Sequence, residues 1–153
     1  MSQNIAQTII KSGFDISLLL NADAAPIEKT FVVPVKYDDE GEVAAGFEIT
    51  SKNSGPYQDA IRETTVGTIK RSQQKNKQID GKTDEGANAL YDLGEDRNMR
   101  IAVAVVVGLP GFVDKGVPVP VTPEIVKALL TKMPTWLDKI IAALEVDANF
   151  LTV

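Results

Sequence analysis

The sequence predicts an α+β protein in which an N-terminal β-hairpin packs on a mainly α-helical bundle. Two observations predict this class. Between Lys29 and Lys52 apolar and polar residues alternate, as in strands that bury one face. Between residues 101 and 150 apolar residues instead recur with helical spacing, separated by proline- and glycine-rich breaks. We expect this last third of the chain to supply most of the core.

The composition is that of one soluble domain. The chain has 153 residues, of which 44% are hydrophobic and 24% charged, so it can form a core without disulfides. We divide the domain 1–153 into an N-terminal segment with the hairpin (1–55), a helix with a basic linker (56–84) and a helical C-terminal part (85–153). The longest apolar run, 101–107, is far shorter than the ~20 residues of a membrane span. Without a signal-peptide pattern at its start, the chain is expected to be intracellular.

The N-terminal third predicts a docking turn followed by a hairpin. Apolar residues between 14 and 20 predict a short helical turn or loop that docks on another surface. The strands are expected at 30–37 and 43–50, joined by a turn at 38–41. Pro34 cannot donate a hydrogen bond, which predicts an edge strand or a bulge. The acidic cluster at Asp38, Asp39, Glu40 and Glu42 is interpreted as a solvated turn rather than a metal or acid–base site.

Capping patterns predict the helices. Ser54 and Pro56 begin a helix that we expect to reach about Gln78, with a thin apolar stripe. A second helix is expected from about Glu85 to Val107, although 101–107 taken alone also fits a buried strand. A third helix begins at Thr122-Pro123-Glu124 and ends before Pro134, and a fourth follows.

The residue types present exclude several kinds of chemistry. The sequence contains no histidine and no cysteine, which excludes Ser-His-Asp and Cys-His nucleophiles and zinc sites built on those residues. The acidic and basic residues between Asp92 and Arg100 are interpreted as ion pairs on an exposed helix face. We therefore expect no enzyme activity, no catalytic residue, no cofactor and no metal.

The remaining candidates are contacts to another protein. A basic run at Lys70, Arg71, Lys75, Lys77 and Lys82 fits a solvated helix end, a protein contact or a nucleic-acid contact. It lacks interleaved aromatic residues, and the net charge of the chain is −5, so nucleic acid is the least favoured of the three. Two aromatic residues at the C-terminal end fit either the core or a partner contact. The candidate partner-binding residues are Tyr57, Ile61, Ile69, Lys70, Arg71, Trp136 and Phe150.

Phe47 and Ile49 precede Ser54 and Tyr57 at the transition from the expected β element to the expected helix. With other short motifs along residues 30–150, this transition resembles that of the tail assembly chaperones of long-tailed (siphovirus-like) bacteriophages. Gly116 and the segment from Val117 to Glu124 resemble the Gly-x-x-Val-Pro helix start of that family. A Trp-containing helix with Trp136 and a terminal Asn149-Phe150 complete the resemblance.

The resemblance implies a non-enzymatic function in the host cell cytoplasm. Such chaperones bind the tape measure protein and keep it soluble until tail tube subunits polymerise around it. A longer form made by ribosomal frameshifting often carries a tube-binding extension, and this chain would be the shorter form. Self-association is a further possibility. Two other classes remain: a structural virion protein of the tail or head–tail junction, and a small regulator that binds nucleic acid through residues 70–82.

Overall fold

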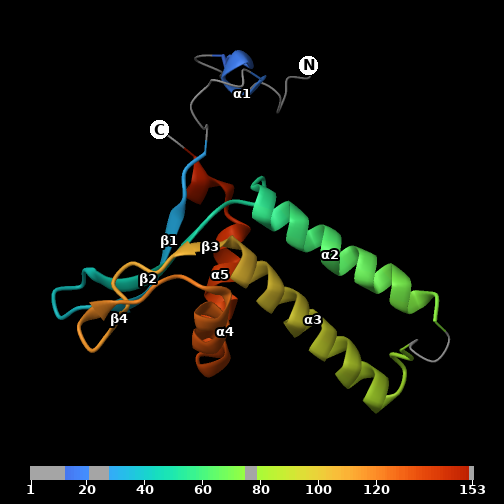
Figure 1. Cartoon of the computed structure of the whole chain (residues 1–153). Helices are drawn as coiled ribbons and strands as arrows, with labels where there is room; N and C mark the ends of the chain where they lie inside the picture. The colour runs from blue at the N-terminus through green and yellow to red at the C-terminus, as the bar shows by residue number, and fades with distance from the viewer. Residues whose placement is uncertain (1–12, 21–27, 75–78, 152–153) are drawn as a thin grey trace, which may run out of the picture.

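A three-stranded antiparallel sheet with the strand order β1-β2-β3 forms one side of the core, and helices form the rest (Figure 1). This computed structural model describes residues 13–20, 28–74 and 79–151. Its elements are α1 (Ser17–Leu20), β1 (Phe31–Tyr37), β2 (Val43–Ile49), α2 (Gly55–Ser72), α3 (Asp84–Val105), β3 (Val106–Gly108), β4 (Val113–Asp114), β5 (Val117–Pro118), α4 (Pro123–Lys132), α5 (Pro134–Leu144) and the short 3-10 helix η3 (Asp147–Phe150). The predicted α+β class is confirmed.

The N-terminal hairpin lies where its alternating pattern predicts it. Val33 of β1 pairs with Phe47 of β2, and both side chains are buried. β1 is an edge strand, and its register shifts after Pro34, so both expectations for this proline are confirmed. In the turn, a carboxylate oxygen of Asp38 accepts hydrogen bonds from the backbone N–H groups of Glu40 and Glu42, each at 2.9 Å. The acidic cluster is thus an exposed turn that one of its own members holds together.

The third strand corrects the predicted end of the second helix. Ile101 to Val105 are helical as expected, but Val106 takes an extended conformation and pairs with Ile49 of β2. The helical prediction for 106–107 was therefore wrong. β-Branched residues lose side-chain freedom in a helix and pack well in a sheet, and the open edge of β2 supplies hydrogen-bond partners. The short hairpin formed by β4 and β5 was not predicted.

The C-terminal helices close the other side of the core. The side chain of Thr122 accepts a hydrogen bond from the N–H of Ile125 at 3.2 Å, and Pro123 follows it, so the predicted start of α4 is confirmed. Pro134 opens α5, as the break predicted there requires. Most of the side chains in the core cluster come from residues 101–150, in agreement with the sequence pattern.

Helices α2 and α3 run side by side and extend away from the sheet and from α4 and α5 (Figure 1). Ser54 and Thr83 cap their N-termini through side-chain oxygens. α2 ends at Ser72, earlier than the predicted Gln78, which lies outside the described residues with the rest of 75–78. We call residues 62–72 and 84–98 of these helices the arm. Its only buried residue is Gly86, so no side chain of the arm is buried.

Near the N-terminus, the predicted helical turn is present as α1. Four apolar side chains in and before it are exposed by 58–73%: Phe14, Ile16, Leu19 and Leu20.

Candidate protein-binding site

The structure separates the seven predicted partner-binding residues into two groups. Tyr57 and Ile61 lie at the base of α2, partly buried against the core cluster. Ile69, Lys70 and Arg71 lie in the last turns of α2, where all three are exposed. These five share one helix. The two C-terminal aromatic residues lie elsewhere.

Phe150 belongs to the core of the chain itself, and Trp136, half-buried, packs against that core. The ring of Trp136 lies 5.9 Å from the ring of Phe47 and 5.9 Å from that of Phe112, both edge-on. Phe150 is 1% exposed and meets the ring of Phe31 edge-on at 6.2 Å. Of the two interpretations left open for these residues, the structure supports packing in the core. Phe150 is not accessible to a partner in this conformation.

The arm carries the apolar surface that remains open. Five of its large apolar side chains are exposed by 37–68%: Val66, Ile69, Leu90, Tyr91 and Leu93. Only Ile69 was among the predicted contacts. The others occur in helical patterns that are interrupted by polar residues and glycine, so the sequence does not tell whether a neighbour covers them. In the described residues, neighbours cover these side chains only in part.

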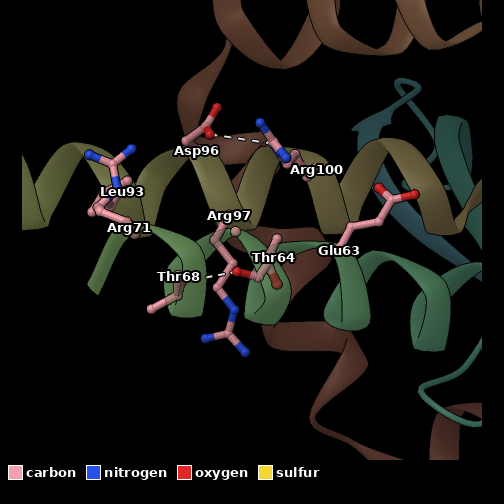
Figure 2. A pocket seen from close by; sticks show the side chains of 10 residues that line it. Glu63, Thr64, Thr68, Arg71, Leu93, Asp96, Arg97 and Arg100 are labelled. Carbon is pink, nitrogen blue, oxygen red and sulfur yellow. Dashed lines mark hydrogen bonds and ion pairs between the residues drawn. The ribbon is translucent and has the colours of Figure 1, made fainter. Parts of the chain in front are cut away.

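A hollow of about 250 Å³ lies between the two helices of the arm (Figure 2). Gly67 of α2 and Gly94 of α3 both line it, and a Cβ atom added to either would meet no atom within 4 Å. Either position therefore has room for a side chain. The remaining lining residues are Glu63, Thr64, Thr68, Arg71, Leu93, Asp96, Arg97 and Arg100.

The charges around the hollow are only partly compensated. Arg100 pairs with Asp96 one turn earlier, at 3.4 Å. Arg71 and Arg97 form no ion pair with any described residue. Figure 2 shows Arg97 reaching from α3 across α2, whereas Arg71 of α2 ends beside Leu93 of α3. Two uncompensated guanidinium groups thus flank the hollow, one from each helix.

A second hollow of about 400 Å³ adjoins the first toward the core. It is lined by Ala60, Met99 and Val103 among others and reaches Lys127 of α4. Glu63, Asp96 and Arg100 line both hollows, so the two meet at these side chains. Together they follow the contact between α2 and α3 from the arm toward the core.

Two further findings concern the described residues only. No group of three or more Asp and Glu side chains gathers in an arrangement that could hold a metal ion. Across residues 13–20, 28–74 and 79–151, no helix combines the length and apolar character that a bilayer crossing requires.

The sequence matches no protein-family model, and neither the curated proteins nor the solved structures contain a match to it.

Proposed function

We propose that this protein is a non-enzymatic tail assembly chaperone of a long-tailed bacteriophage, acting in the host cell cytoplasm. It binds the tape measure protein and keeps it soluble until the tail tube polymerises. The observation that supports a protein-binding role is the arm, which exposes five large apolar side chains and buries none. The motifs around Phe47, Ser54 and Val117 support the particular family and partner.

The arm has the dimensions and chemistry to hold a helix. Residues 62–72 and 84–98 form helical lengths of about 16 and 22 Å at 1.5 Å per residue. A partner helix laid along them would cover apolar side chains at helical intervals. Complete burial of one such side chain contributes about 1.5–3 kcal/mol, and partial burial contributes less. An association of this kind is reversible, as a chaperone that is later displaced requires.

Co-expression with the tape measure protein tests the proposal. We expect the wild-type chain to raise the soluble fraction of the tape measure protein and to co-purify with it. Replacing Val66, Ile69 and Tyr91 by Ser should abolish both effects, because it removes apolar surface from the arm. The matched control replaces Val113 and Val117 by Ser on the β4–β5 hairpin, where these valines are 58% and 65% exposed. Absence of both rescue and co-purification by the wild type would exclude this function.

Composition of the mature particle separates the chaperone from a structural virion protein. A chaperone is displaced during assembly, so mass spectrometry of purified phage should not detect it. Detection at fixed copy number would favour the virion protein instead. A gel shift that weakens steeply with salt would favour a nucleic-acid-binding regulator, because phosphate contacts release counterions.

A further inference from the structure

Two glycines of the arm, Gly67 and Gly94, have no packing role that the described chain explains. Gly67 and Gly94 each lie in a helix interior, where glycine is the weakest helix former after proline. A Cβ at either position would meet open space. Gly111 is different, because a Cβ there would lie 1.9 Å from the carbonyl oxygen of Ala44. Close approach of backbones explains Gly111, and likewise Gly86 beside Asp80, but not Gly67 and Gly94.

Gly67 and Gly94 leave the hollow between α2 and α3 deep enough to receive a side chain of a partner. Packed helices interlock when side chains of one enter gaps between side chains of the other. The hollow of about 250 Å³ is such a gap, and it opens at a level where α2 and α3 bury no side chain against each other. Leu93 and the threonines at 64 and 68 line its sides. A large apolar side chain that enters between them would gain contacts on both helices.

The charges beside the hollow indicate what should flank that side chain. Arg71 and Arg97 form no ion pair among the described residues, whereas Arg100 is paired with Asp96. The lining also includes the acid Glu63, which lies nearer the core end of α2 than Arg71 does. Positive charge is therefore in excess toward the far end of the hollow. Carboxylates of a partner would complement it there.

Resting on the protein-binding role proposed above, we propose that the hollow is the docking site for one amphipathic helix of the partner. That helix inserts a large apolar side chain above Gly67 and Gly94 and places carboxylates beside Arg71 and Arg97. The acidic residues of the partner helix lie toward the Arg71 end of the hollow.

The test uses the full chain and two labelled helical peptides that share one leucine stripe. One carries Glu beside the stripe and the other carries Lys, and binding is measured by fluorescence anisotropy. We expect the Glu peptide to bind about tenfold more tightly, because two exposed ion pairs of up to ~1 kcal/mol each are gained or lost. Reversal of charge in R71E/R97E should reverse the preference. R62E is the matched control, because Arg62 lies on α2 outside the hollow and contacts Asp59.

Leucine substitutions at the two glycines test whether a side chain of the partner enters the hollow. G67L and G94L should each weaken Glu-peptide binding by about tenfold or more, since a missing apolar contact of ~1.4 kcal/mol has that effect. G55L is the control, because Gly55 also has open space around it but lies at the first turn of α2. Far-UV circular dichroism should show undiminished helix content in G67L and G94L. This readout separates a filled site from a lost fold.

Several outcomes would overturn the proposal: no binding of either peptide, equal binding of both, or unchanged binding by G67L and G94L. A dimer in sedimentation that both glycine variants disrupt would assign the hollow to a second copy of the chain instead. Failure of the proposed function is distinguishable. If the wild type binds the Glu peptide but not the tape measure protein, the site stands and the function fails. If G67L still co-purifies with the tape measure protein, the function stands and the site fails.

Discussion

Gly111 lies in the turn after β3, where the backbone of this turn closely approaches the backbone of β2. Its φ is +82°, and a Cβ would lie 1.9 Å from the carbonyl oxygen of Ala44. We expect Gly111→Ala to lower the free energy of unfolding by more than about 2 kcal/mol, because a left-handed conformation alone costs an L-residue about 1–2 kcal/mol. Urea denaturation measures the difference.

Gly41 provides the control for that prediction. Its φ is +84°, but a Cβ would meet nothing within 4 Å. Gly41→Ala should therefore show the conformational cost alone, about 1–2 kcal/mol. Equal losses at the two positions would mean that the close approach to Ala44 relaxes without cost.

Phe150 packs the end of the described chain against the first strand. It is 1% exposed, and its carbonyl oxygen accepts a hydrogen bond from the N–H of Lys29 at 2.9 Å. Truncation to Ala should lower the free energy of unfolding by about 3–5 kcal/mol, the usual loss for a buried Phe. Leu151→Ala is the control, since that side chain is 54% exposed and its removal should change stability by less than about 0.5 kcal/mol. A similar small effect at Phe150 would place this ring outside the cooperative core.

Among the elements, the ion pair between Lys52 and Glu145 joins the loop before α2 to the end of α5. The Lys52 ammonium nitrogen lies 2.6 Å from a carboxylate oxygen of Glu145. This hydrogen bond, more than any other influence, raises the pKa of Lys52 above its ordinary 10.5, against the opposing effect of burial. A raised pKa in the folded state stabilises the fold fully below pH 10.5, and the stabilisation is lost as pH rises through the folded pKa.

Glu145→Gln should therefore flatten the fall of stability with pH above 10.5. Both side chains are more than a third exposed, so we expect less than about 1 kcal/mol at neutral pH. Thermal denaturation across an alkaline pH series measures both effects. The control is Asp138→Asn on α5, because Asp138 forms no ion pair with a described residue. Parallel pH curves for the wild type and Glu145→Gln would contradict the assigned cause.

Local signals predicted most of the elements, and a non-local contact decided the one that was wrong. Thr122 and Pro123 are a local signal for the start of α4, because a helix cap and a fixed φ act within one turn. Val106 carries no such signal. It joins the sheet because β2, more than fifty residues earlier, offers an open edge, and periodicity in 101–107 does not contain that information.

The candidate site shows the same limit. Exposure of Ile69, Lys70 and Arg71 follows from a thin apolar stripe that ends in basic residues, so the sequence could predict it. The hollow could not be predicted in this way. Gly67 and Gly94 each appear in the sequence as a weak point of one helix, and only the pairing of α2 with α3 brings them to one space.

The whole molecule combines a well-packed core with an arm that lacks buried side chains. Phe47, Ile49 and Ile140 are fully buried, whereas residues 62–72 and 84–98 bury only Gly86. Segments with few buried apolar contacts open locally at lower free energy than the global fold. We expect amide hydrogen exchange to be faster in the arm than in β2 and α5, although the arm is helical throughout.

A bound partner should change this pattern selectively. A ligand that binds the folded form of a segment suppresses its local opening. The proposed partner, the tape measure protein, should therefore slow exchange in the arm and leave β2 and α5 nearly unchanged. Hydrogen exchange followed by mass spectrometry, with and without the partner, measures the change. The variant with Val66, Ile69 and Tyr91 replaced by Ser should lose the added protection. Exchange slows where a partner makes contact. Protection from exchange on α4 or the β4–β5 hairpin instead would therefore show that the partner binds there and not on the arm.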